Sequence, residues 1–144
     1  MASLAQTIPA SRAQASSTAP VVFLGRLFFV LIFLLAGLNH FSKPTIAFAA
    51  SQGVPAAPLL VPASGILAIL GGLSILLGYR AKLGAWLIVI FLIGVTPLHK
   101  FWGISDPMVQ QLQMALFMKN ISMLGAALLI TQFGSGPWSL DARK

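Results

Sequence analysis

The feature that most constrains this chain is an apolar run that occurs four times, each time close to the length that a bilayer crossing needs. The first run covers residues 21–41 and carries a single charge, at Arg26. A bilayer core about 30 Å thick needs roughly 20 helical residues per crossing. Three further apolar runs occupy about residues 58–78, 83–99 and 110–132. The pattern predicts an all-α membrane protein built as a bundle of four transmembrane helices.

The composition makes lipid the solvent for most of the chain. Of the 144 residues, 58% are hydrophobic, and the mean hydropathy is +0.92. A soluble globule of this size would need far more polar surface, and four crossings leave room for a single domain. The absence of cysteine excludes disulfides, iron–sulfur ligation and covalent haem attachment. Any redox role must therefore use a bound cofactor.

The nine basic residues set the expected orientation. They are scattered at helix ends and form no stripe with stacking aromatic residues, which argues against nucleic acid as a partner. Lys and Arg concentrate on the cytoplasmic side of membrane proteins. Lys43 and Lys100 lie on one side, whereas six lie on the side shared by both termini: Arg12, Arg26, Arg80, Lys82, Arg143 and Lys144. We therefore expect both termini to face the cytoplasm (N-in/C-in).

Polar segments flank the predicted bundle. Residues 1–20 are rich in Ala, Ser, Thr and Pro without an apolar period, and are expected to form a flexible tail. A transit peptide is the weaker alternative, because the segment is short. A signal-peptide interpretation of residues 21–41 is set aside, because three more apolar runs follow. Residues 134–144 are expected to form a polar tail, with Trp138 as an anchor at the level of the headgroups.

A short helix is expected between the first two crossings. Ser42 suits an N-cap and Pro44 a first helical turn, while Gly53 and Pro55 would end the helix. The segment TIAFAASQ between them is too short to cross a bilayer. We expect it to lie in the outer interface.

The second crossing is rich in small residues. Ser64, Ala68 and Gly72 lie four apart and therefore share one helix face. Small side chains let helix backbones approach closely, so this face is expected to pack tightly within the bundle.

Polar residues in or beside the apolar runs gather in the outer half of the predicted bundle. Such residues are expensive in lipid and mark candidate sites. The expected vestibule comprises Asn39, His40, His99, Trp102, Gln113, Lys119 and Asn120. The two histidines have an alternative role as interfacial residues with wet tips. A bis-histidine haem or metal site is less favoured, because the spans hold no third ligand and no supporting carboxylate.

Lys119 is the most informative member of this vestibule. At 1.5 Å per residue it lies roughly 10 Å below the outer mouth, too deep for easy snorkelling. No acidic residue in any span can pair with it, so we expect it to bind carbonyls, amides, water or a quinone-like ligand. Arg26, Arg80 and Lys82 lie near cytoplasmic ends and are interpreted as lipid and topology anchors. Asp106 is interpreted as a helix N-cap rather than a catalytic acid.

Several short motifs occur in order along residues 25–141. They are Gly25-Arg26-Leu27, Gly37-Leu38-Asn39-His40-Phe41, Gly53-Val54-Pro55, the stretch GGLSILLGYRAKLGAWLI from Gly71, Phe101-Trp102, Lys119-Asn120 and Gly136-Pro137-Trp138-Ser139-Leu140-Asp141. In their order and spacing they resemble the DoxX family of small membrane proteins.

This resemblance implies a four-helix fold in a bacterial-type inner membrane. Through kinship with the DoxD-type subunit of thiosulfate:quinone oxidoreductase, it also implies a link to quinone-coupled or oxidative-stress redox complexes. Many family members carry a glutamate where this chain has Ala68, and a lysine where it has His40. A proton-relaying carboxylate is therefore absent, which argues against autonomous catalysis.

The vestibule and the resemblance favour a quinone- or redox-associated membrane subunit, with a quinone as the candidate cofactor. The alternative is a non-enzymatic accessory protein, whose small-residue faces and cationic rims pack against a larger membrane complex, lipids or further copies of the chain. A small-solute transporter is less favoured, because the sequence shows no inverted repeat with broken helices.

The orientation predicts which positions a membrane-impermeant thiol reagent reaches in intact cells. Single cysteines at Ser3, Ala81 and Ser105 sample the two sides, and no native cysteine interferes. We expect labelling at position 105 and protection at positions 3 and 81, because the excess of basic residues holds that side inside. Labelling at 3 and 81 with protection at 105 would reverse the orientation.

Overall fold

The computed structural model describes residues 10–143, and the side chains from residue 18 onward. Four of its helical segments are long and apolar enough to cross a membrane. They are α1 (Ala10–Asn39), α3 (Ala57–Leu77), α4 (Ala81–Val95) extended by the 3-10 turn η1 (Thr96–His99), and α5 (Pro107–Phe133). Two shorter elements are α2 (Lys43–Ser51) and the 3-10 turn η2 (Asp141–Arg143). The predicted all-α, four-span architecture is confirmed.

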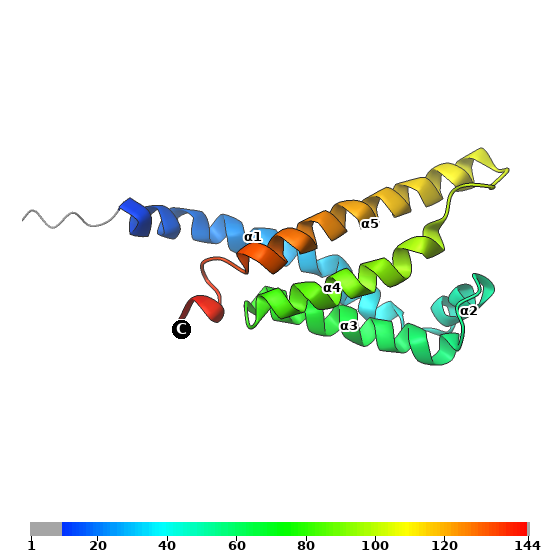
Figure 1. Cartoon of the computed structure of the whole chain (residues 1–144), viewed down its shortest axis with the longest axis horizontal. Coiled ribbons are helices and arrows are strands. Elements are labelled where there is room, and N and C mark those ends of the chain that lie inside the picture. Colours follow the sequence, from blue (N-terminus) through cyan, green and yellow to red (C-terminus); the bar gives the residue numbers. More distant parts are fainter. Residues whose placement is uncertain (1–9, 144) are drawn as a thin grey trace, which may run out of the picture.

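The long helices run alternately in opposite directions (Figure 1). The start of α1, the α3–α4 turn and the C-terminal segment therefore lie at one end of the bundle, and α2 and the α4–α5 connection lie at the other. We call these the terminal end and the α2 end. Which of them faces the cytoplasm stays a prediction of the basic-residue count.

The first helix starts earlier than the sequence suggested. Residues 10–20, expected to belong to a flexible tail, form the first turns of α1, and residues 1–9 lie outside the described part of the chain. Pro20 sits inside this helix, where it removes one backbone hydrogen bond. Alanine has the highest helix propensity, and a segment that extends an existing helix avoids the cost of nucleation.

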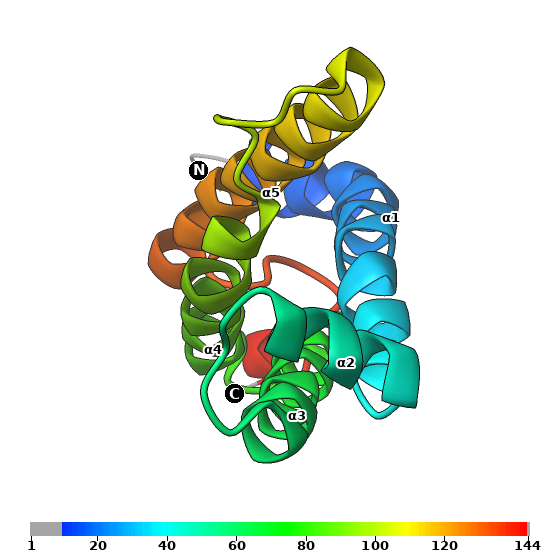
Figure 2. The ribbon, with the colours of Figure 1, turned by 90° about the vertical axis from the view of Figure 1, so that its right-hand side faces the viewer.

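The helix α3 is the centre of the packing. Its neighbours are α1 on one side and α4 on the other, whereas α5 packs mainly against α4 and η1. Figure 2, which looks along the bundle, shows α1 and α5 on opposite sides of this arrangement. The buried core joins the helices α1, α3, α4 and α5 through Val30, Phe33, Ala68, Ile75, Ala85, Ile88, Leu92 and Ala127.

Glycine contacts explain how closely α3 approaches its neighbours. A Cβ atom added at Gly65 would lie 2.7 Å from the carbonyl oxygen of Gly37 on α1. One added at Gly71 would lie 2.8 Å from the carbonyl oxygen of Gly84 on α4. Ala68 and Gly72 are buried beside the same face of α1, which confirms the predicted tight packing at these two positions. Ser64, the third residue of the predicted face, is only half-buried.

Local capping fixes the ends of two helices. The Ser42 hydroxyl accepts a hydrogen bond from the backbone N–H of Thr45 at the start of α2. The Asp106 carboxylate accepts from the N–H groups of Met108 and Val109 at the start of α5. Both N-caps were predicted from the sequence. The helix α2 packs on the beginning of α3 through a small separate apolar cluster of Ala49, Ala57 and Val61.

The C-terminal segment folds back on the bundle, although the sequence suggested a polar tail. The Asp141 carboxylate accepts hydrogen bonds from the N–H groups of Arg80 and Ala81, and so caps α4. The N–H groups of Leu140 and Asp141 bond the carbonyls of Leu77 and Gly78. Because these bonds satisfy both sides of the α3–α4 turn, the segment is an integral part of the fold.

Arg26 holds the other side of this segment. Its Nη2 donates to the carbonyl oxygens of Trp138, at 2.6 Å, and Pro137, at 3.3 Å. The side chain is 5% exposed, and its Nε and Nη1 atoms have no hydrogen-bond partner within the described residues. The expected role of Arg26 as a lipid anchor is therefore corrected. The guanidinium is hydrogen-bonded to backbone carbonyls of the folded-back segment, so it does not extend to the lipid headgroups.

The α3–α4 contact predicts that Gly71→Ala destabilises the bundle. The added methyl group would overlap the backbone of α4, and overpacking of this kind costs about 1–3 kcal/mol. Gly125→Ala on α5 is the matched control, because its Cβ would meet no atom within 4 Å. We expect a lower thermal melting temperature in detergent for Gly71→Ala, and an equal or higher one for Gly125→Ala. Equal melting of the two variants would contradict this account.

Candidate functional site

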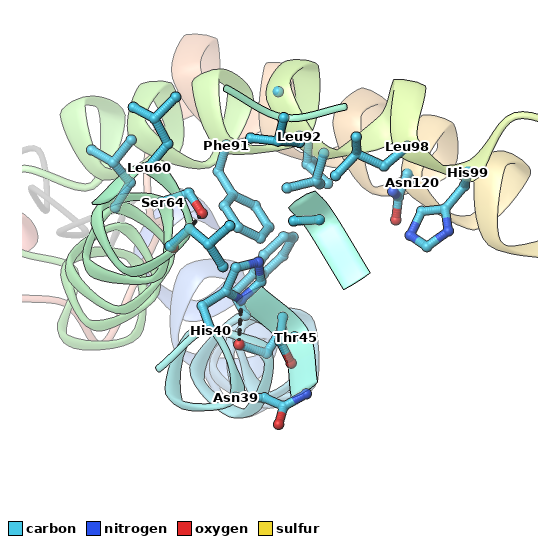
Figure 3. A pocket seen from close by; sticks show the side chains of 18 of the residues that line it. Asn39, His40, Thr45, Leu60, Ser64, Phe91, Leu92, Leu98, His99 and Asn120 are labelled. Carbon is cyan, nitrogen blue, oxygen red and sulfur yellow. Dashed lines mark hydrogen bonds between the residues drawn. The ribbon is translucent and has the colours of Figure 1, made fainter. Parts of the chain in front are cut away.

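A cavity of about 720 Å³ lies at the α2 end of the bundle (Figure 3). The helices α1 to α5 and the turn η1 all contribute to its lining, which is mostly apolar. The polar lining residues are Asn39, His40, Thr45, Ser64, His99, Lys119 and Asn120. Small-molecule sites are typically hollows of roughly 300–1,000 Å³ with a few placed polar groups. Five of the seven residues expected in the vestibule line this cavity.

His40 reaches the cavity from the end of α1. Its Nδ1 atom lies 2.6 Å from the carbonyl oxygen of Ala36, and its ring meets the edge of Phe91 at 5.4 Å between centroids. A carbonyl can only accept a hydrogen bond, so Nδ1 carries the proton. In the neutral imidazole this leaves Nε2 as a hydrogen-bond acceptor.

His99 enters from η1, on the other side of the cavity from His40 (Figure 3). Its Nδ1 atom lies 3.0 Å from Oε1 of Gln113 on α5. Gln113 does not line the cavity, and it acts by orienting this imidazole. With Nδ1–H donated to the amide oxygen, the neutral ring again presents Nε2 as an acceptor.

Asn120 is the most enclosed polar residue of the site. It is 3% exposed, lies on the same face of α5 as the buried Ala127 and Thr131, and lines the cavity. Among residues 10–143 its amide has no hydrogen-bond partner. Among the described residues the fully enclosed side-chain polar atoms without a partner belong to Arg26, so the Asn120 amide is open to the cavity. The amide is therefore available to a ligand as both donor and acceptor.

Lys119 lines the cavity but is not enclosed by the bundle. Its side chain is exposed, in contrast to that of Asn120. Adjacent residues of an α-helix point about 100° apart, so burial of Asn120 against α4 turns Lys119 toward the open side of α5. The helices of the bundle do not enclose this ammonium, and its burial at the depth of the α5 span stays a prediction. Lys119 places a positive charge at the edge of the cavity.

Asn39 and Trp102 take peripheral positions. Asn39 is exposed at the cavity edge, and its Oδ1 accepts a hydrogen bond from the Ser42 hydroxyl. Trp102 is 59% exposed, and it does not line the cavity. Its ring packs instead with Phe101 and Phe117 in an aromatic cluster. These contacts hold Trp102 beside Phe117 of α5, and its covering of a bound ring stays a prediction.

The sequence did not single out several lining residues. Phe91 lies within an unbroken apolar run, and Thr45 and Phe48 belong to α2, which was expected only to lie in the interface. The amphipathic character of α2 was the sequence signal that could have identified these residues, because the apolar face of a short helix packs against other parts of the protein.

The three other expected anchors lie at the terminal end. Arg80, Lys82 and Trp138 are all exposed there. The ring centroids of Trp138 and Phe23 are 6.5 Å apart. Their contact with headgroups stays a prediction. For metals, the described part of the chain contains no group of three or more His, Cys, Asp or Glu side chains.

Fold and site together define a small integral membrane protein with four crossings and one ligand-sized cavity at the α2 end. Comparison with known proteins supports this class and makes it specific. The family model described as DoxX matches residues 21–102, and the chain belongs to the DoxX family. No solved structure gives a significant match.

Two relatives come from Escherichia coli strain K12. The inner membrane protein YphA is 30% identical over 128 residues, which cover 86% of this chain and 91% of YphA. The inner membrane protein YqjF is 29% identical over 122 residues, which cover 83% of this chain and 88% of YqjF. The predicted location, a multi-pass protein of the inner membrane, is thereby confirmed.

The unpartnered amide predicts an unusual response to Asn120→Leu. This change keeps the approximate volume and removes the unpaired polar group, so the melting temperature should stay level or rise. Thr131→Val is the control, because the buried Thr131 hydroxyl donates to the carbonyl of Leu128 at 2.7 Å and its loss should lower stability. A large drop for Asn120→Leu would show that the amide supports the fold instead.

Proposed function

We propose that the cavity binds the head group of a quinone or quinol, and that this DoxX-family protein serves as a membrane subunit of a quinone-linked redox system. The observation that carries the proposal is the unpartnered Asn120 amide, 3% exposed, inside an apolar cavity of ligand size. A buried polar group without a partner is costly, and the cost is offset when a ligand supplies the hydrogen bonds.

The hydrogen-bonding groups suit both redox forms of the ligand. A quinone offers two carbonyl acceptors, which the Asn120 amide and the Lys119 ammonium can satisfy as donors. A quinol offers two hydroxyl donors, which the Nε2 atoms of His40 and His99 can accept. Phe33 and Phe91 supply aromatic surface for the ring.

The division of labour follows from what the chain contains. A bound quinone supplies the redox chemistry. The two imidazoles provide proton acceptors, and the apolar lining limits access of water. Without cysteine the chain cannot hold an iron–sulfur cluster, so the electrons would pass to or from a partner protein. The role is therefore that of a binding subunit rather than an autonomous enzyme.

A second candidate function is that of an accessory protein without a ligand. The observation that favours it is the exposed face of α5, where Ala115, Ser122 and Gly125 share one side of the helix. Small residues on a lipid-facing surface let another transmembrane helix pack closely. The accessory function depends on this exposed face of α5 and does not depend on Asn120.

Quinone retention distinguishes the two functions. The protein is purified in mild detergent, and co-purifying lipids are extracted and identified by mass spectrometry. We expect wild-type protein to retain quinone and Asn120→Leu to lose at least about tenfold, since one buried hydrogen bond is worth about 1.4 kcal/mol. Lys119→Met should weaken retention as well, and Lys100→Met, outside the cavity, should not.

Two results would support the accessory function instead. One is full quinone retention by a folded Asn120→Leu variant. The other is loss of partner proteins from a Gly125→Leu variant whose quinone content is unchanged.

A further inference from the structure

A second cavity, of about 620 Å³, lies at the terminal end of the bundle. The start of α4, the end of α5 and the folded-back C-terminal segment form it. It lies at the opposite end of the bundle from the proposed quinone site, and none of its lining residues belongs to the first cavity.

The second cavity has an uncompensated positive charge. Arg80 and Lys82 line it, and neither forms an ion pair with any other residue of the described chain. The Arg80 guanidinium lies over the ring of Tyr79, and the Lys82 side chain runs beside Gly134. Asp141 also lines the cavity, but its two carboxylate oxygens already accept the backbone N–H groups at the start of α4.

A buried hydroxyl adds a specific contact. Ser135 is 5% exposed and lines the cavity. Its hydroxyl makes no hydrogen bond to any residue from 10 to 143. Ser139 beside it is already occupied, since its hydroxyl donates to the carbonyl of Gly136 and accepts from the N–H of Ala142. Ser135 is therefore the one buried hydroxyl here that still needs a partner.

A third positive charge lies behind the cavity wall. The segment that contributes Ser139 to the lining is the one whose Pro137 and Trp138 carbonyls bind the buried Arg26 guanidinium. Three basic side chains against one carboxylate make the local potential positive, and an anion is the complementary ligand.

The apolar rim indicates what kind of anion fits. Leu83 and Phe133 line the same cavity, and Phe133 is 82% exposed at the end of the α5 span. A ligand held here would touch cations with one part and lipid-facing hydrocarbon with another. Basic pockets between transmembrane helices bind anionic headgroups in this way.

We propose that the second cavity is a binding site for the phosphate headgroup of an anionic phospholipid. Arg80 and Lys82 pair with the phosphate, the Ser135 hydroxyl donates a hydrogen bond to one of its oxygens, and the acyl chains lie along Leu83 and Phe133. Free inorganic phosphate shares the headgroup chemistry but lacks the acyl chains, so the two sources can be separated by experiment.

The test is native mass spectrometry of the detergent-purified full chain with added dioleoyl phosphatidylglycerol or dioleoyl phosphatidylcholine. We expect preferential retention of phosphatidylglycerol by the wild-type protein. The Arg80→Gln/Lys82→Gln double variant should lose roughly fivefold per charge removed, the factor that corresponds to ~1 kcal/mol per basic residue. Asp141 bonds the backbone and not the side chain of Arg80, so the α4 cap survives this change. Ser135→Ala should weaken retention without removing charge.

The controls separate a built site from general attraction. A Lys43→Gln/Lys100→Gln variant removes the same charge outside this cavity and should retain phosphatidylglycerol like the wild type. Millimolar inorganic phosphate should leave the lipid in place. The proposal is overturned if the two double variants lose lipid equally, if phosphatidylcholine is retained as well as phosphatidylglycerol, or if phosphate alone displaces the lipid. Unchanged melting temperatures show that the variants are folded.

Discussion

The close approach of α3 to both of its neighbours is the constraint on which the rest of the structure depends. In lipid the hydrophobic effect does not drive helices together, so association depends on packing and on polar contacts. Gly65 meets Gly37 of α1, and Gly71 meets Gly84 of α4, with spacing that admits no side chain. These contacts fix α1, α3 and α4 as a unit. The helix α5 is left to pack mainly on α4 and η1.

The two ends of the bundle differ as a consequence. At the terminal end, Arg26 of α1 binds the folded-back C-terminal segment, and Asp141 of that segment caps α4, so this network ties α1 to the α3–α4 turn. At the α2 end, no comparable network joins α1 to α5 within the described residues, and a cavity of about 720 Å³ remains under α2. The terminal end is closed by these hydrogen bonds, and the cavity at the α2 end offers room for a ligand.

Both cavities pair an apolar wall with a buried polar group that lacks a partner. Asn120 in the first cavity and Ser135 in the second are each at least 95% buried, and nothing else in the described chain satisfies them. Asn120 lies within the α5 span, where little water is available, so a ligand is its natural partner. The proposed quinone and the proposed phospholipid are both amphiphiles dissolved in the bilayer, and each would meet a polar site with apolar surroundings.

The sequence by itself determined the features that depend on local patterns. The lengths of the apolar runs predicted the four crossings. The side chains of Ser42 and Asp106 predicted the starts of α2 and α5, because an N-cap residue hydrogen-bonds only to the first turn of its own helix. Tertiary structure decided how each helix is rotated, and hence that Asn120 is buried while Lys119 is exposed. It also decided that Arg26 binds carbonyls 111 and 112 residues away instead of headgroups. No local pattern encodes such contacts, because they exist only once the helices have packed.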